Sequence, residues 1–292
     1  MLQREPVSLS NLRLNRFTII IFTQFILIIK MESKEYVNVI SYGAGKQSTY
    51  MLLNALEGKY KFKPDFAIYS DLQCETKATE MYVNYIKSYV KNRYDFDIII
   101  VSEGNLMKDI EDYLSGKTKR GCSIPLFSGD TGAPINRQCT SDYKIKPIRQ
   151  YLQKARNGKK IRQWIGISAD ESERMKTPNV KYIEHYYPLV ENRIRIDEIK
   201  QWFKDNNIPE PMKSSCLICP FHSHQYWQNL KKNFPVEFET ACDFDEKIRQ
   251  LPKMKSKTYL YRKCIPLKDA DFTMQPSLFP ELIEECEGLC GL

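Results

Sequence analysis

The feature that most constrains the fold of this chain is a regular alternation of short apolar segments with amphipathic segments, beginning at Tyr36. The apolar segments resemble buried parallel strands, and the amphipathic segments repeat apolar residues at helical spacing. Strands that alternate with helices of this length favour a parallel sheet with right-handed crossovers. The predicted order is a strand at 37–40, a helix at 47–57, a strand at 66–69, a helix at 76–92, a strand at 96–101, a helix at 143–156 and a strand at 164–167.

The remainder of the chain predicts a second, smaller unit. Residues 116–137 are rich in Gly, Ser, Thr, Lys and Pro, and we expect a long loop there. After Pro188 we expect short helices, two of them near 223–250. The predicted fold class is α/β, with helices on both faces of the sheet and a mainly helical, cysteine-containing C-terminal region. The predicted units are 1–30, 31–190 and 191–292.

Residues 1–30 differ in character from the rest of the chain. Residues 17–29 form an apolar run that is shorter than the roughly 20 residues of a membrane-spanning helix. Arg13 and Arg16 precede the run as in a signal peptide, but no small-residue cleavage site comes after it. A membrane anchor, a buried strand and an extension upstream of a start at Met31 are the alternatives. We favour the extension, and expect no membrane contact, because Met31 opens a polar lead-in to a coherent domain.

Composition excludes several protein classes. Hydrophobic residues make up 42% and charged residues 27% of 292, which excludes a disordered or fibrous chain. The net charge of +8 favours polyanionic partners without establishing nucleic-acid binding. Nine cysteines, an odd number in a long chain with CxxC and CxxxC spacings, argue against a secreted disulfide scaffold. We therefore expect a cytoplasmic protein with reduced cysteines, some of them metal or cluster ligands.

The loop Ser41-Tyr42-Gly43-Ala44-Gly45-Lys46-Gln47-Ser48-Thr49 lies between a predicted strand and a predicted helix. Backbone N–H groups and the helix dipole favour an anion at such a place, although a tight turn without a ligand remains the alternative. A Walker loop fails at Ile40 and Gln47, and a dinucleotide fingerprint fails at Ser48. Residues 45–48 resemble the end of Ser-Gly-Gly-x-Asp-Ser, the pyrophosphate loop of adenine-nucleotide alpha-hydrolases, with Gln47 in place of Asp.

Three later segments occur in the order found in one branch of that superfamily. Residues 70–76 resemble a shortened Asp-Thr-Gly-x-x-x-x-Glu-Thr, and 137–148 resemble Arg-x-Cys-Cys…Lys-x-x-Pro-Leu. Residues 166–174 resemble Gly-x-Arg-x-x-Gln-Ser-x-x-Arg. On these motifs, residues 31–190 are similar to the phosphoadenosine phosphosulfate reductase-like family of pyrophosphate-loop enzymes. The resemblance implies a Rossmann-like, nucleotide-binding domain.

The resemblance also implies roles for individual residues. ATP phosphates would lie in the loop, and Mg²⁺ would be held by Asp71, since it prefers carboxylate and phosphate oxygens. Lys46 would neutralise charge that develops on phosphate. Gln47 leaves one family role in doubt, because an amide does not ligate a metal as a carboxylate does. The candidate catalytic residues are Lys46, Asp71 and Arg174, and the candidate nucleotide-binding residues are Ser41, Gly43, Gly45, Lys46, Gln47, Ser48, Asp71, Arg137 and Lys144.

The cysteines suggest a metal centre. Cys216 and Cys219 are spaced so that one turn brings both sulfurs to one metal, although buried cysteines are often only small hydrophobic residues. Iron–sulfur members of the family use a Cys-Cys pair with a later CxxC, and this chain offers Cys139 followed by Thr140. One ligand is therefore missing. If Cys286 or Cys290 completes the set, a [4Fe-4S] cluster or a Zn²⁺ site is closed, with Cys122 as a further candidate; if only three cysteines bind, an iron site stays open.

Three functions are compatible with these patterns. The first is an ATP-dependent adenylating enzyme that releases pyrophosphate and transfers sulfur to tRNA, DNA or a small molecule, with a sulfur-donor protein as partner. The second is a reductase of phosphoadenosine phosphosulfate or adenylyl sulfate, which needs a cysteine of the tail as nucleophile. The third is a non-catalytic nucleotide-binding subunit. An oligomer is compatible with all three.

Overall fold

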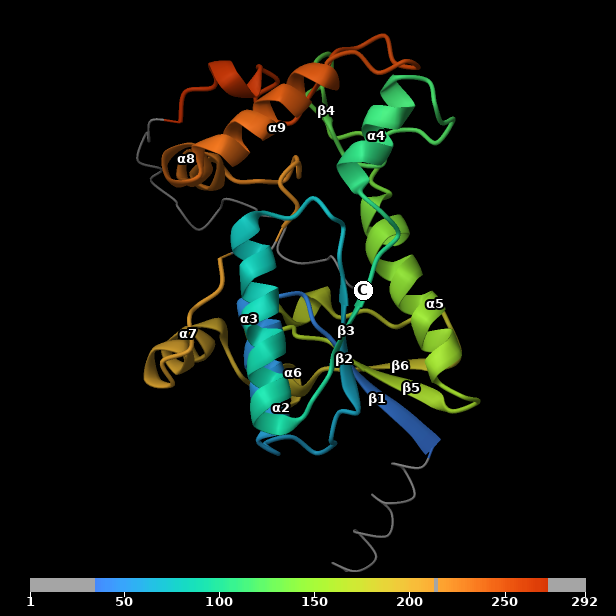
Figure 1. Cartoon of the computed structure of the whole chain (residues 1–292), viewed down its shortest axis with the longest axis vertical. Coiled ribbons are helices and arrows are strands. Elements are labelled where there is room, and N and C mark those ends of the chain that lie inside the picture. The colour runs from blue at the N-terminus through green and yellow to red at the C-terminus, as the bar shows by residue number, and fades with distance from the viewer. Residues whose placement is uncertain (1–34, 213–214, 273–292) are drawn as a thin grey trace, which may run out of the picture.

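A five-stranded parallel sheet forms the centre of the computed structural model, which describes residues 35–212 and 215–272 (Figure 1). Its strand order is β3-β2-β1-β5-β6, so the direction of winding reverses next to β1. In open α/β sheets, ligands bind at such a switch point, outside the carboxyl ends of the strands. The strands are β1 Tyr36–Ser41, β2 Phe66–Ser70, β3 Ile98–Val101, β5 Lys160–Trp164 and β6 Ile183–Tyr186.

Helices cover both faces of this sheet (Figure 1). The helices α2 (Lys46–Leu56) and α3 (Lys77–Tyr94) lie on one face, and α5 (Lys146–Ala155) lies on the other. Helix α7 (Ile196–Asp205) packs beside α2, where the rings of Tyr50 and Trp202 lie 5.2 Å apart. The predicted α/β class and its parallel sheet are therefore confirmed.

The last strand of the prediction is misplaced. The sequence pattern predicts a strand at 164–167, but β5 ends at Trp164 and begins four residues earlier than predicted. Two of its polar residues are buried, and each has a partner: the Arg162 guanidinium lies 3.6 Å from the centre of the Phe62 ring, and Gln163 Nε2 donates to Ser41 Oγ at 2.6 Å. Strand β6 and helix α4 (Leu106–Leu114) were not predicted.

The predicted loop at 116–137 contains one short strand, β4 (Phe127–Ser128), which pairs antiparallel with β7 (Thr258–Tyr259). The predicted helix at 143–156 is found as a π-helical segment, Thr140–Ile145, that continues into α5. Pro147 lies in the first turn of α5, where the missing N–H of proline costs no helical hydrogen bond.

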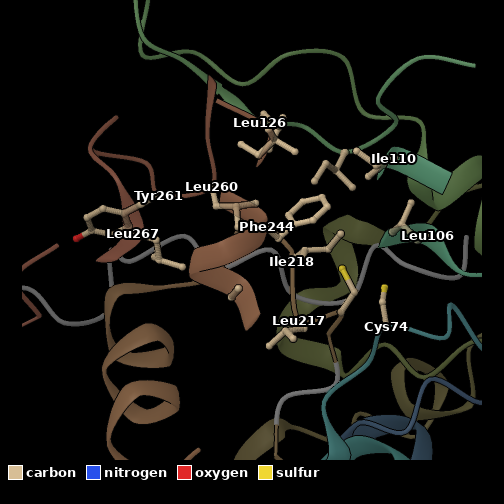
Figure 2. Close-up of a cluster of buried hydrophobic side chains, with 14 of the residues drawn as sticks. Cys74, Leu106, Ile110, Leu126, Leu217, Ile218, Phe244, Leu260, Tyr261 and Leu267 are labelled. Atoms are coloured by element: carbon tan, nitrogen blue, oxygen red, sulfur yellow. The ribbon is translucent and has the colours of Figure 1, made fainter. Parts of the chain in front are cut away.

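The C-terminal region is mainly helical, as predicted, and contains α6 (Pro188–Glu191), α8 (His224–Asn233) and α9 (Pro235–Lys247). Its core is a cluster of buried side chains in which Phe244 of α9 packs near Leu126, Ile218 and Leu260 (Figure 2). The cluster takes residues from both sides of position 190, since Leu106 and Ile110 of α4 also belong to it. The boundary at 190 stays a prediction.

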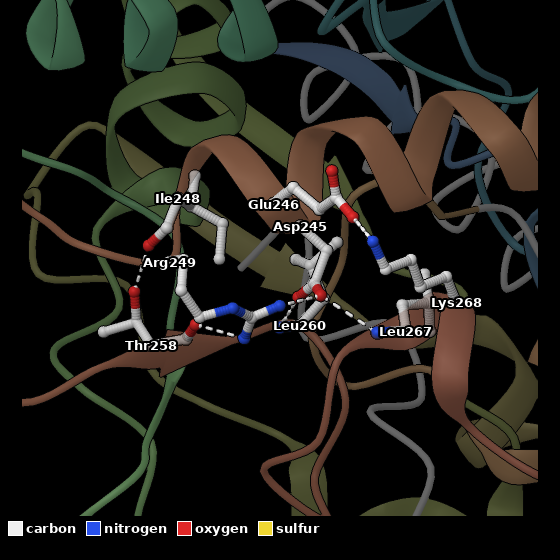
Figure 3. Close-up of polar contacts among 8 residues, drawn as sticks. All are labelled: Asp245, Glu246, Ile248, Arg249, Thr258, Leu260, Leu267 and Lys268. Atoms are coloured by element: carbon white, nitrogen blue, oxygen red, sulfur yellow. Dashed lines mark hydrogen bonds and ion pairs between the residues drawn. The ribbon is translucent and has the colours of Figure 1, made fainter.

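Asp245 connects α9 to the segment that comes after it (Figure 3). Its fully buried carboxylate accepts hydrogen bonds from the backbone N–H of Leu260 at 2.7 Å and of Leu267 at 2.9 Å, and pairs with the Arg249 guanidinium. Arg249 also donates to the Thr258 carbonyl at 2.7 Å. A buried carboxylate with this many donors holds the chain after α9 against the helix.

Within 35–212 and 215–272, no helix is long and apolar enough to cross a membrane. The apolar run at 17–29 and the candidate start at Met31 lie outside the described residues, so the expectations for them stay predictions.

Candidate functional site

The glycine loop joins the carboxyl end of β1 to the first turn of α2. Ser48 Oγ accepts hydrogen bonds from the backbone N–H groups of Gly43 at 3.3 Å and Gly45 at 3.2 Å, and donates to the Gly45 carbonyl at 3.1 Å. Ala44 has a φ of 56°, in the left-handed region. The first turn of α2 contains no acidic residue, so no carboxylate of that turn neutralises the positive end of the helix dipole.

The segment after β5 lies directly against this turn. A Cβ on Gly166 would lie 3.0 Å from the Ser48 nitrogen and 3.2 Å from the Gln47 carbonyl carbon, closer than side chains approach a backbone. Glycine at 166 therefore brings the turn Ala169–Arg174 next to the loop.

Gln47 and Arg174 meet at one carboxylate. Gln47 Nε2 donates to Ser168 Oγ at 2.7 Å and to Glu171 Oε2 at 2.6 Å. Glu171 Oε2 also accepts a hydrogen bond from Arg174 Nη1 at 2.7 Å. The structure thus brings two predicted site residues together through Glu171, which was not among the predicted site residues.

Lys46, the first residue of α2, forms an ion pair with Glu210. Its Nζ lies 2.5 Å from Glu210 Oε1, and both side chains are about one-third exposed, at 33% and 36%. Because Glu210 is 164 positions away, no local motif could have identified it.

Ser41 and Asp71 lie at the ends of neighbouring strands. The Ser41 hydroxyl accepts the hydrogen bond from the Gln163 amide, and the Asp71 Oδ1 accepts one from the backbone N–H of Gln73 at 2.7 Å. Asp71 is half-buried at the carboxyl end of β2. These two predicted residues therefore lie at the same edge of the sheet as the loop.

Charged groups surround Tyr69, the last residue but one of β2. Burial raises the pKa of the Tyr69 hydroxyl; Glu75 raises it further, Lys144 lowers it and Asp71 raises it. Lys144 lies in the π-helical segment before α5, and the Ser70 hydroxyl donates to the carbonyl of Tyr143 at 2.6 Å. The predicted cation Lys144 is thus held beside the end of β2.

Arg137 and Cys139 lie farther toward the cysteine region. The Arg137 guanidinium lies 5.5 Å from the centre of the Phe221 ring, two residues after Cys219. The backbone N–H of Cys139 donates to the Ser123 carbonyl at 2.9 Å. Burial raises the pKa of the Cys122 thiol to about 11, and the neighbouring Cys139 contributes to the rise.

Cys74 is a thiol of this region to which the sequence motifs assign no role. The backbone N–H of Leu217 donates to the Cys74 carbonyl at 2.8 Å, and Glu75 and Cys216 form an isolated antiparallel bridge. Figure 2 shows Cys74 near Leu217 and Ile218. The sequence feature that could have pointed to Cys74 is its position within the motif segment 70–76.

The Cys216 thiol interacts with two others. A hydrogen bond with Cys219 lowers the pKa of Cys216, but a hydrogen bond with Cys74 and complete burial outweigh it, so the pKa lies well above its ordinary value. His222 Nε2 lies 2.9 Å from the Cys216 carbonyl oxygen, and its ring stacks on Tyr226 with centres 3.5 Å apart. The contacts place His222 against the backbone of the CxxC segment.

A closed metal centre is not assembled by the described residues alone. Within them, no three or more His, Cys, Asp or Glu side chains form a group able to hold a metal ion. Cys286 and Cys290, predicted to complete the set with Cys139, Cys216 and Cys219, lie outside the described residues. The ligand set therefore stays a prediction, and the described thiols by themselves do not fit a cluster or Zn²⁺.

Comparison with known proteins places this fold beside two enzymes. No family model and no curated protein sequence matches the chain. One similar solved structure is the phosphoadenylyl-sulfate (PAPS) reductase from Candida auris in its phosphate complex, with 14% identity, coverage of 68% of this chain and 91% of that chain, and a TM-score of 0.37. Another is the U34-tRNA thiolase NcsA from Methanococcus maripaludis with its [4Fe-4S] cluster, with 15% identity, 80% and 84% coverage, and a TM-score of 0.42. Both structures are similar to this chain only at low sequence identity.

Proposed function

We propose that this chain is an ATP-dependent adenylating enzyme of the pyrophosphate-loop type. It cleaves ATP between the α and β phosphates, transfers AMP to an oxygen of its substrate and releases pyrophosphate. A sulfur nucleophile then displaces AMP. The proposal rests on one arrangement at the first turn of α2, beside the switch point of the sheet. Lys46 and Gln47 lie in this turn, and Gln47 and Arg174 are hydrogen-bonded to the same Glu171 carboxylate.

Each part of this arrangement suits a polyphosphate. The helix N-terminus favours a negative charge, and Gly43 and Gly45 allow a phosphate to approach the backbone closely. Lys46 and Arg174 place cations beside it, and a preorganised cation stabilises the charge that develops during nucleotidyl transfer. When ATP binds, a phosphate replaces Glu210 as the partner of Lys46, so that the ammonium group of the loop becomes available to the nucleotide.

The carboxylates present fit a nucleotide-bound Mg²⁺. Mg²⁺ in such sites takes one or two carboxylates, phosphate oxygens and water, so a cage of three protein ligands is not required. Asp71 is half-buried at the end of β2, and its Oδ1 is engaged by the N–H of Gln73 while the carboxylate retains a second oxygen. Asp71 is therefore the residue that would hold Mg²⁺, which when bound would neutralise phosphate charge.

Sulfur transfer is the finer part of the proposal. Cys74, Cys216 and Cys219 form a chain of contacting thiols, and Cys74 lies three residues after Asp71. The segment from Asp71 to Cys74 therefore connects the proposed nucleotide-binding residues with the thiols. The acceptor we propose is a nucleic acid, tRNA or DNA, or a small molecule, and a sulfur-donor protein supplies the sulfur atom.

The test uses ATP labelled in the α phosphate, Mg²⁺ and bulk tRNA or DNA, with AMP and pyrophosphate as the measured products. We expect Lys46→Ala to lower product formation by at least about tenfold, since removing one charge-stabilising donor typically costs roughly 2.7–4 kcal/mol. Lys77→Ala is the matched control, because Lys77 is the first residue of α3 and is exposed outside the loop.

Two results would contradict the proposal. Sulfite release from phosphoadenosine phosphosulfate with a thiol reductant, without pyrophosphate release from ATP, would identify a reductase. ATP binding without any AMP formation, across nucleic acids and small acceptors, would identify a non-catalytic nucleotide-binding subunit.

A further inference from the structure

The glycine loop and the turn after β5 each contribute one polar side chain to a shared contact. The loop carries an amide at Gln47, and the turn carries a carboxylate at Glu171.

These two positions are in direct contact, although 124 residues separate them. Gln47 Nε2 lies 2.6 Å from Glu171 Oε2, and Arg174 Nη1 lies 2.7 Å from the same oxygen. The Glu171 and Arg174 side chains are each only 16% exposed. Ser168 accepts the second hydrogen bond of the Gln47 amide at 2.7 Å.

The donors and acceptors of the two side chains explain why the contact needs one amide and one carboxylate. An amide NH₂ group has two donors, and Gln47 uses them on Ser168 and Glu171. An ionised carboxylate only accepts, and Glu171 Oε2 accepts from Gln47 and from Arg174. Two carboxylates here would repel each other, and two amides would remove the ion pair that Arg174 makes in this half-buried place.

We propose that Gln47 and Glu171 act as a complementary amide–carboxylate pair, in which Glu171 is a positioning residue that holds Arg174 at the proposed phosphate loop. The inference rests on the proposed nucleotide site and deepens it. Glu171 supplies, from the turn after β5, the negative charge that the loop lacks at position 47. The affinity for ATP therefore depends on having one amide and one carboxylate at positions 47 and 171, and not on which of the two positions carries which group.

The test measures the affinity for ATP by calorimetry in the full-length protein. We expect Glu171→Gln and Gln47→Glu each to weaken binding by about tenfold, within the range of coupling seen between residues in contact. The exchanged double variant, Gln47→Glu with Glu171→Gln, is expected to return to within about threefold of the wild type, because one carboxylate and one amide are again in contact. Glu173→Gln removes an exposed charge from the same turn and is expected to leave the affinity unchanged.

A second arm separates positioning from general structure. In an Arg174→Ala background, Glu171→Gln is expected to cause no further loss, because the residue that Glu171 positions is gone. Equal or tighter ATP binding by Glu171→Gln, or a double variant as weak as the product of the two single losses, would overturn the inference. If the wild type itself binds no ATP, the proposed function fails and the inference fails with it, a result distinct from loss of coupling alone.

Discussion

At the scale of single residues, the glycine loop makes contacts that a bound anion would have to displace. Glu210 neutralises Lys46 from a distant segment, and Glu171 holds the amide of Gln47. Partly exposed ion pairs of this kind contribute only about 0.2–1 kcal/mol to stability. We expect a contact of that strength to give way to a triphosphate, which would offer Lys46 more negative charge.

The ion pair between Lys46 and Glu210 leads to a prediction about binding. Glu210→Gln is expected to tighten ATP binding by roughly 3-fold to 10-fold, because a competing carboxylate is removed, and to change stability by less than about 1 kcal/mol. Calorimetric titration with ATP measures the first effect and a denaturant midpoint the second. The matched control is Glu57→Gln, which removes a similarly exposed pair with Lys59 at the other end of α2. An unchanged affinity in Glu210→Gln would show that Glu210 does not compete with ATP.

At the scale of elements, close packing explains where the site forms. Gly166 allows the segment after β5 to touch the first turn of α2, and the Gln163 side chain connects β5 to the end of β1. Strands β1 and β5 are neighbours on the two sides of the switch point. The glycine loop therefore gains the partners of Ser41 and Gln47 from β5, which the sequence pattern placed four residues too late, and from the segment after it. The partner of Lys46, Glu210, comes from a different segment.

The segment after α9 depends on Asp245 (Figure 3). Asp245→Ala is expected to lower the free energy of unfolding by about 3–5 kcal/mol, because it leaves the Arg249 guanidinium and two backbone N–H groups without their buried acceptor. The denaturant midpoint measures the loss. Glu246→Ala, which removes the neighbouring exposed pair with Lys268, is expected to cost less than about 1 kcal/mol. Equal losses for the two variants would mean that the Asp245 network does not hold this segment.

At the scale of the whole molecule, buried tyrosines and thiols make stability depend on alkaline pH. Burial raises the pKa of Cys122 to about 11 and of Cys242 to about 12, and raises the pKa of Tyr42 and Tyr60 above the ordinary 10.0. The unfolded chain releases these protons near 9.0 for Cys and 10.0 for Tyr, whereas the folded chain retains them. The folded state therefore binds more protons, and its stability decreases as pH rises.

The prediction is a stability that is full below about pH 8. It declines above about pH 9 because of thiols such as Cys122, and above about pH 10 also because of tyrosines such as Tyr42, by up to roughly 1.4 kcal/mol per pH unit for one such group. Denaturant unfolding at about pH 7 and about pH 10 measures this change. A free energy of unfolding that stays constant or rises over this interval would contradict it.

Local sequence patterns were enough to specify the parallel sheet, its helices and the position of the glycine loop between β1 and α2. Apolar periodicity and glycine act within a few residues, so they can be read from a single stretch of chain. The same local patterns missed β6. They also misplaced β5, because its residues Arg162 and Gln163 are polar and are buried through contacts with Phe62 and Ser41.

Only the folded arrangement determines which groups meet at the site. Lys46 meets Glu210, Gln47 meets Glu171, and Cys74 meets Cys216, all across more than a hundred positions of chain. No local pattern encodes such pairs, because a side chain's charge or thiol acquires a partner only when the sheet order brings distant segments together. The position of the glycine loop could therefore be predicted from the sequence, whereas its contacts with Glu210 and Glu171 required the fold.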